Sequence, residues 1–378
     1  MSGRARLREI LEWRGFLDPG PENAISDVAG VRVGHTTLIT GSGVLNAGHG
    51  PIRTGVTVVL PHDRNLLHEK VGAAVHAING HGKVMGFEEV REVGVIEAPI
   101  ALTNTFNVGL VADALLAYAI REDSSVGVEF RSRSLNVVVG ETNDGYLNDL
   151  RGRHVRQEHV WDAIEAALRS TPGTPIEEGA VGAGTGTGCY GWKGGIGTSS
   201  RLVPQEAGGF TVGVLVQSNF GEAPQLVIGG VPVGRHILPP DCTGPLESEA
   251  GSIMVVIATD APLTSRQLGR LCRRAVGGLV RTGSVLGPRS GEFVIAFSTT
   301  NRVSHLPAFV TTQETVIADE DAATTWLFPA VVESVEEAIL NSIFKAETMT
   351  GRDEHKRYAL PLENVAKLIA SHGGSSIG

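Results

Sequence analysis

The junction between Gly251 and Ser252 has the residue types of a self-cleaving peptide bond. A small, flexible residue precedes a serine that opens the apolar run 253–258, and the segment before it could be cut without disturbing a core. Cleavage there would give Ser252 a free α-amine, whose ordinary pKa is about 7.7–8.0. Such an amine can take the proton of its own serine hydroxyl and so activate it as a nucleophile. Gly-Ser pairs are common, however, and a turn into a strand explains the same residues.

The glycine-rich segment 179–200 contains the pattern GxGxxG, formed by Gly186, Gly188 and Gly191. A dinucleotide site needs this pattern between a strand and an apolar helix. Here Trp192, Lys193 and two further glycines follow, which is not a helical sequence. The segment therefore predicts a glycine-lined loop packed beside an active site rather than a nucleotide-binding loop.

The histidines and cysteines do not have the spacing of metal ligands. The sequence has 12 histidines and 3 cysteines, with neither an HExxH nor a CxxC motif. An odd number of widely spaced cysteines also argues against a disulfide framework. We therefore expect no metal and no other cofactor. A Ser-His-Asp triad stays open at this point, because its members can lie far apart in a sequence.

The segments that must position these residues alternate between strand and helix patterns. The run 253–258 is apolar at every position, which indicates a strand buried on both faces. Ser334 and Glu337 have the spacing of a capping box, which predicts that a helix begins at Ser334. Helices among strands predict an α/β or α+β fold with helices outside the sheets. Strands are expected at 56–60, 135–139, 209–217, 253–258 and 293–297, helices at 108–120, 160–168 and 264–280, and an exposed loop at 238–251.

Composition excludes several classes of protein. Of 378 residues, 42% are apolar and 19% charged, which excludes wholesale disorder. The net charge of −9, without a basic stripe, argues against nucleic-acid binding. No apolar run reaches the roughly 18 residues of a membrane span, and the N-terminus lacks an apolar signal core. We therefore expect a cytoplasmic protein without membrane or nucleic-acid partners, and no linker divides 1–378 into separate domains.

Long segments spread over nearly the whole chain carry a resemblance to one family. They are AISDVAGVRVGHTTL (24–38), INGHGKVMGFEEV (78–90), APIALTNTFNVG (98–109), GETNDGYLND (140–149), GAGTGTGCYGWKGGIGTSSR (182–201), VLVQSNFG (214–221), GSIMVVIATDAPL (251–263) and RSGEF (289–293). In these segments the chain resembles the DmpA-like self-processing aminopeptidases, peptidase family S58. That family includes an L-aminopeptidase/D-amidase-esterase and the bacterial β-peptidyl aminopeptidases.

The resemblance implies a fold and an activity. The implied fold is a four-layer αββα sandwich that resembles N-terminal nucleophile hydrolases but connects its strands differently. The precursor would cut itself into 1–251 and 252–378, which stay associated, and the αβ units would form a homo-oligomer. The implied activity is hydrolysis of the N-terminal residue from short peptides, aminoacyl amides or esters through an acyl-enzyme on Ser252.

The resemblance also implies site residues. Ser252 would be the nucleophile, and Ser290 and Glu292 would be the other two catalytic residues. Ser290 and Glu292 are two positions apart, so on a strand their side chains would point to the same face. Asn219 and Tyr146 would form the oxyanion hole, and Glu141 is the candidate for the substrate's ammonium group.

Other interpretations stay open at this level. Ornithine acetyltransferases share a similar fold and self-processing, although they use a threonine nucleophile. An uncleaved, non-catalytic binding protein and a cofactor-dependent oxidoreductase are further alternatives. The sequence does not decide between L-, D- and β-residues, or between amides and esters.

Overall fold

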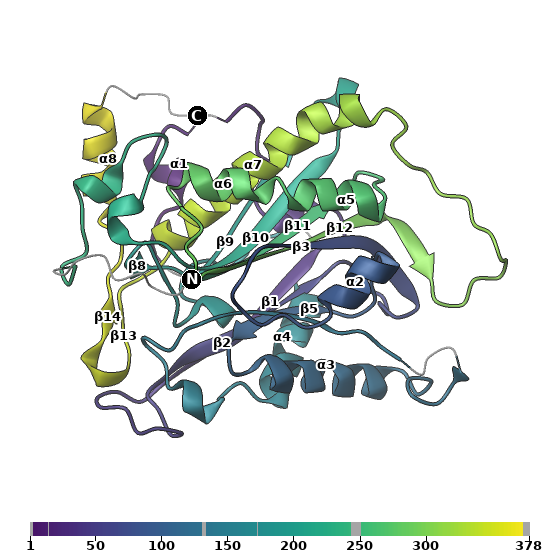
Figure 1. The fold of residues 1–378 in the computed structure, drawn as a ribbon, viewed down its shortest axis with the longest axis horizontal. Helices are drawn as coiled ribbons and strands as arrows, with labels where there is room; N and C mark the ends of the chain where they lie inside the picture. Colours follow the sequence, from purple (N-terminus) through teal and green to yellow (C-terminus); the bar gives the residue numbers. More distant parts are fainter. Residues whose placement is uncertain (1–2, 14, 131–133, 172, 243–250, 373–378) are drawn as a thin grey trace.

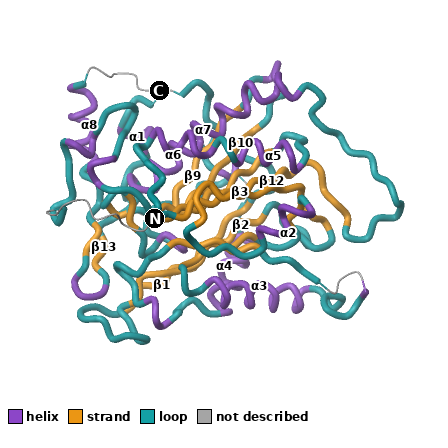
Figure 2. Tube along the Cα trace, in the orientation of Figure 1, coloured by secondary structure: helices purple, strands orange, loops and turns teal. Residues whose placement is uncertain are grey.

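Two β-sheets lie face to face between two groups of helices (Figures 1 and 2). The computed structural model describes residues 3–13, 15–130, 134–171, 173–242 and 251–372, so most of the predicted loop at 238–251 lies outside the described residues. One sheet has the strand order β1-β2-β5-β6, and the other has the order β4-β3-β12-β11-β10-β9. Their bounds are β1 Arg32–Thr40, β2 Ile52–Leu60, β3 Glu69–Gly80, β4 Val95–Ile96, β5 Ile100–Asn104, β6 Val138–Thr142, β9 Ile196–Leu202, β10 Thr211–Asn219, β11 Ser252–Thr259 and β12 Gly291–Ser304.

The helices cover the outer face of each sheet. α3 and α4 enclose an apolar cluster with the four-stranded sheet, whereas α5, α6 and α7 enclose another with the six-stranded sheet. A third cluster fills the space between the sheets. This arrangement confirms the expected αββα layering. The helices are α1 Leu7–Ile10, α2 Phe87–Val93, α3 Val108–Glu122, α4 Gln157–Arg169, α5 Ser265–Cys272, α6 Ala275–Arg281, α7 Glu320–Phe344 and α8 Leu362–Ser371, and two short hairpins pair β7 Gly188–Cys189 with β8 Trp192–Lys193 and β13 Met349–Thr350 with β14 Lys356–Arg357.

β11 is buried on both faces, as its continuous apolar run predicts. Ile253, Val255 and Ile257 pack into the cluster beneath α5 to α7. Met254 and Val256 point the other way, into the cluster between the sheets. Because alternate side chains leave opposite faces of a strand, only an uninterrupted apolar run satisfies both environments.

Two helix predictions were wrong. The helix expected at 264–280 is divided into α5 and α6, and a Cβ on Gly278 of α6 would lie 2.6 Å from Val335 Cβ of α7, so the second half packs closely on α7. The capping box is absent, because α7 begins after Asp319 and runs through Ser334 and Glu337. Glu337 instead accepts a hydrogen bond from the buried Arg201. No helix in the described ranges is long and apolar enough to cross a bilayer.

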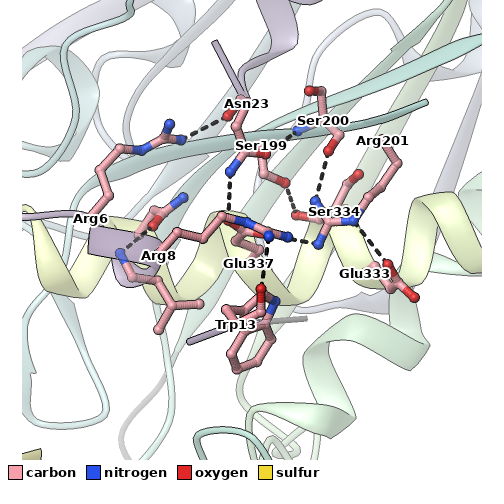
Figure 3. A network of polar contacts seen from close by, with 12 residues as sticks. Arg6, Arg8, Trp13, Asn23, Ser199, Ser200, Arg201, Glu333, Ser334 and Glu337 are labelled. Atoms are coloured by element: carbon pink, nitrogen blue, oxygen red, sulfur yellow. Dashed lines mark hydrogen bonds and ion pairs between the residues drawn. The ribbon is translucent and has the colours of Figure 1, made fainter. Parts of the chain in front are cut away.

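A buried ion cluster fastens α7 to β9 and to the N-terminal segment (Figure 3). Arg201 of β9 is fully buried and donates hydrogen bonds to Glu333 (2.9 Å) and Glu337 (2.7 Å). Arg8 donates to both oxygens of Glu337, at 2.8 and 2.9 Å, and Asn23 donates to it at 2.5 Å. The charges are thus paired and hydrogen-bonded, which is the condition for burying them.

Replacing Arg201 by Met should destabilise the fold strongly. Glu333 and Glu337 would each lose a buried cationic partner, and breaking such a pair costs about 3–5 kcal/mol. The free energy of unfolding, measured by denaturant titration, should fall accordingly. The matched control is Arg266→Met, which breaks an ion pair with Glu320 at the surface and should cost far less because water screens it. Equal losses in the two variants would contradict the structural role of the cluster.

Candidate active site

Three strand ends of the six-stranded sheet meet at Ser252. Ser252 is the first residue of β11 and pairs with Gly291, the first residue of the parallel strand β12. On its other side Ser252 pairs with Asn219, the last residue of β10. Strand pairing therefore brings together positions that lie far apart in the sequence. Three segments named from the sequence, those around 219, 252 and 290, meet at one edge.

The Gly251–Ser252 bond lies directly beside Ser290. The Gly251 carbonyl oxygen accepts a hydrogen bond from the Gly291 N–H at 2.9 Å. A Cβ on Gly251 would lie 3.0 Å from Phe220 Cα and 3.2 Å from Ser290 Oγ. This is tighter than ordinary packing, so the close approach of Ser290 favours glycine at 251. Ser290 itself precedes β12 rather than lying on it, which corrects the expectation that it shares a strand with Glu292.

Glu292 is a buried carboxylate that has no hydrogen-bond partner of regular geometry in the described part of the chain. Its side chain is 1% exposed, and neither oxygen has a partner among the described residues. Burial raises the pKa of Glu292, while the nearby side chains of Ser290 and Asn79 oppose the rise. Both side chains lie near the carboxylate, but neither makes a hydrogen bond of regular geometry with it. Such a carboxyl is available to accept a proton or a hydrogen bond.

Asn219 is oriented by the glycine-rich segment. Its Oδ1 accepts a hydrogen bond from the Gly188 N–H at 3.0 Å, which leaves the Nδ2 group on the other side of the amide as a donor. The Tyr190 N–H donates to the Phe220 carbonyl at 2.8 Å, so the same segment also holds the residue after Asn219. The glycine-rich segment thus packs beside the site, as predicted, but it is not a loop throughout, because it contains β7, β8 and the first residues of β9.

Tyr146 contacts two side chains of the segment around β13 and β14. Its ring stacks on His355, with centroids 4.6 Å apart, and the Arg357 guanidinium lies 4.0 Å from its centroid. Arg357 in turn packs beside Gly188, whose N–H holds Asn219. Tyr146 is not among the residues that line the cavity at Ser252. The structure therefore links it to the site through Arg357 and the glycine-rich segment.

A cavity of about 410 Å³ opens at Ser252 between the ends of the two sheets. The four-stranded sheet contributes residues at the carboxyl ends of β5 and β6, and the six-stranded sheet contributes residues after β3 and before β11 and β12. The volume suits a small ligand. The lining residues are Gly80, His81, Gly82, Lys83, Thr105, Glu141, Asn143, Gly251, Ser252 and Arg289.

Glu141 is the only acid that lines this cavity in the described part of the chain. Its Oε1 accepts a hydrogen bond from the Lys83 N–H at 2.9 Å. Burial raises the pKa of Glu141, and the Lys83 N–H, the Lys83 charge and Thr105 oppose this. The Lys83 ammonium donates to Thr105 Oγ1 at 2.9 Å. Glu141 and Ser252 thus line the same cavity, and the role of Glu141 remains a prediction.

Sequence reasoning missed Asn79, Lys83 and Arg289. Asn79 pairs with Glu292 across β3 and β12, and Lys83 and Arg289 line the cavity. Asn79 and Lys83 lie in the INGHGKVMGFEEV segment, and Arg289 directly precedes Ser290. Only their place in family-like segments could have signalled them, because their residue types are unremarkable on their own.

Known proteins resemble this chain over almost its full length. The model of peptidase family S58 matches residues 23–357. Beta-peptidyl aminopeptidase BapA of Sphingosinicella xenopeptidilytica is 42% identical over 369 residues, covering 93% of this chain and 88% of that protein. The solved structure of a Burkholderia sp. beta-aminopeptidase has a TM-score of 0.87 at 40% identity, covering 98% of this chain and 99% of its own. The L-aminopeptidase D-Ala-esterase/amidase of Ochrobactrum anthropi, described as a prototype serine aminopeptidase and a new variant of the Ntn hydrolase fold, has a TM-score of 0.84 at 36% identity, covering 97% of this chain and 99% of its own.

Replacing Glu292 by Gln should stabilise the fold in a pH-dependent way. An acid whose pKa is raised by folding destabilises the folded state as the pH rises from its unfolded-state pKa through its folded-state pKa. The gain from Glu292→Gln should therefore be small at pH 4 and larger, on the order of 1 kcal/mol, at pH 8.

The measurement is denaturant unfolding at both pH values. Both chains carry Ser252→Ala so that neither can be cut, and Glu314→Gln, at an exposed position, is the control. A gain that shrinks from pH 4 to pH 8 would contradict an unpartnered buried carboxylate at 292.

Proposed function

The chain belongs to peptidase family S58, and on this premise we propose that it is a self-processing serine aminopeptidase. Its substrates would be short peptides, aminoacyl amides and esters, from which it removes the N-terminal residue. One observation carries the proposal. Ser252 begins β11 beside the start of β12, with the Gly251 carbonyl held by the Gly291 N–H and with Ser290 against Gly251.

The first stage is cleavage of the Gly251–Ser252 bond. Ser252 Oγ attacks the Gly251 carbonyl carbon, and negative charge develops on an oxygen that the Gly291 N–H already contacts. The C–N bond then breaks as a proton passes to the Ser252 nitrogen, which leaves an ester between Gly251 and Ser252 Oγ. Water hydrolyses this ester to give the Gly251 carboxylate and a free Ser252 amine. The products are the proposed chains 1–251 and 252–378.

The second stage is turnover of substrate. The free Ser252 amine takes the proton of its own hydroxyl as Oγ attacks the substrate carbonyl. The protonated amine then gives this proton to the leaving amine or alcohol, and an acyl-enzyme forms on Ser252. Water deacylates it. Glu292, buried and unpartnered, is suited to accept a hydrogen bond through Ser290 and to stabilise positive charge on the amine.

The remaining site residues have supporting roles in the proposal. Asn219 Nδ2, oriented by Gly188, donates to the oxyanion of the tetrahedral intermediate. Tyr146 is the second proposed oxyanion donor, and its stacking against Arg357 connects it to the same segment. Glu141 would bind the ammonium group of the substrate. A cytoplasmic location remains a prediction of the sequence.

The proposal includes a homo-oligomer of αβ units. The segment between β12 and α7 extends away from the body as a long arm (Figure 1). Leu306, Phe309 and Val310 on this arm are 55%, 79% and 105% exposed. Large apolar side chains gathered on an exposed segment are typical of protein interfaces. The arm therefore supports association through this end of the molecule.

Purified wild-type protein should separate into two chains on denaturation. Residues 252–378 number 127 (378 − 251), so the 39.7 kDa chain should give fragments of about 26 and 13 kDa, the smaller beginning Ser-Ile-Met-Val. Ser252→Ala should remain a single chain, because it lacks the attacking oxygen. Ser265→Ala, at an exposed serine, is the control. Intact mass and N-terminal sequencing provide the measurement, and a cleaved Ser252→Ala chain would refute the assignment.

Replacing Asn219 by Asp should lower kcat by about 10²–10³-fold. The amide that donates a hydrogen bond to the oxyanion is replaced by a negatively charged carboxylate, which can only accept one. KM should change much less, since the donor acts on the transition state. Steady-state kinetics on the cleaved fraction measure the effect. Asn364→Asp, at an exposed position on α8, is the control. A kcat within a few-fold of wild type would remove Asn219 from the oxyanion hole.

A further inference from the structure

An arginine with no role in the proposed chemistry lines the cavity at Ser252. Arg289 is exposed and directly precedes Ser290. In the described ranges, no hydrogen bond or ion pair engages its guanidinium. An arginine free of partners at the mouth of a small cavity is available to a ligand.

The other charges at the cavity are already engaged with each other. Glu141 accepts a hydrogen bond from the Lys83 N–H, and the Lys83 ammonium donates to Thr105 and partly opposes the rise that burial causes in the pKa of Glu141. Lys83 and Glu141 therefore offset one another. Among the described residues that line the cavity, Arg289 is left without a compensating charge, so this lining favours a ligand that carries a carboxylate in addition to any ammonium group.

The backbone beneath Arg289 is held in place. The Gly287 carbonyl accepts hydrogen bonds from the Ser290 N–H at 3.0 Å and from Asn79 Nδ2 at 2.7 Å. Asn79 belongs to β3, so these bonds tie the turn that carries Arg289 to the sheet. A fixed base reduces the entropy that the guanidinium loses when it binds a ligand.

We propose that Arg289 binds the C-terminal carboxylate of a dipeptide substrate whose scissile carbonyl lies at Ser252. The inference rests on the proposed function and specifies its substrate class. A guanidinium recognises a carboxylate through two parallel hydrogen bonds. An extended dipeptide spans about 7 Å, so its ammonium and its carboxylate both fit within one cavity of about 410 Å³. Arg289 is thus a specificity residue that favours free dipeptides over their amides.

The test compares alanylalanine with alanylalaninamide, in whichever of the L, D or β-alanyl series the wild type cleaves faster. The two peptides differ only in the C-terminal carboxylate. In Arg289→Gln the ratio of kcat/KM for the acid to that for the amide should fall at least tenfold, mainly through KM for the acid. Arg289→Lys should restore part of the ratio, because it keeps the charge and loses the bidentate geometry.

Arg169→Gln is the matched control, because Arg169 is an exposed arginine at the end of α4 and does not line the cavity. It should leave the ratio as in the wild type. A ratio unchanged in Arg289→Gln would overturn the inference. A third peptide, aspartylalaninamide, carries its carboxylate on the first residue. If Arg289→Gln lowered kcat/KM for this peptide alone, the assignment of Arg289 to the C-terminal carboxylate would be overturned.

Failure of the proposed function has a different signature, because the wild type would then cleave neither peptide. Calorimetric binding of alanine and alaninamide still tests Arg289 in that case. Alanine should bind the wild type more tightly than alaninamide does, and Arg289→Gln should remove the difference. Equal binding of the two by the wild type would overturn the inference.

Discussion

The parallel pairing of β11 with β12 is the constraint on which the site depends. Both strands are buried on two faces, and a shift of one residue would move every side chain to the opposite face. The apolar core therefore sets the register. Because Ser252 and Gly291 are partners in that register, core packing also determines which backbone N–H contacts the Gly251 carbonyl. The chemistry at this edge is a consequence of burial along the strands.

Two buried glutamates show how the surroundings separate a structural role from a chemical one. Burial acts to raise the pKa of Glu337, but Arg201 and Arg8 outweigh it, and the pKa lies below its ordinary value. Glu292 is equally buried without such a partner, and its pKa is raised. The first carboxylate holds α7 to β9. The second remains free to exchange protons or hydrogen bonds. Burying such a carboxyl costs folding free energy, which interactions elsewhere in the fold must offset.

Local patterns failed where tertiary contacts competed with them. Ser334 and Glu337 have capping-box spacing, yet Glu337 pairs with Arg201, from a strand more than a hundred residues earlier, and the helix continues through both residues. The helix predicted at 264–280 is divided into α5 and α6, and Gly278 of α6 packs closely against α7. Each outcome depends on a partner remote in sequence, which no local spacing reveals.

The sequence by itself determined several of the buried strands and the mixture of strands with outer helices, because periodicity and apolar runs follow from burial on one or two faces. The four-layer arrangement and Ser252 as the nucleophile came from the resemblance to a family. Family-like segments also identified Ser290, Glu292, Asn219 and Glu141 as site residues, although they could not say how these lie relative to one another. Only the tertiary structure decided that the Gly251 carbonyl meets the Gly291 N–H and that Arg289 lines the same cavity as Lys83 and Glu141. Hydrogen bonds and charge balance depend on distances between segments, and those distances exist only once the sheets have formed and packed.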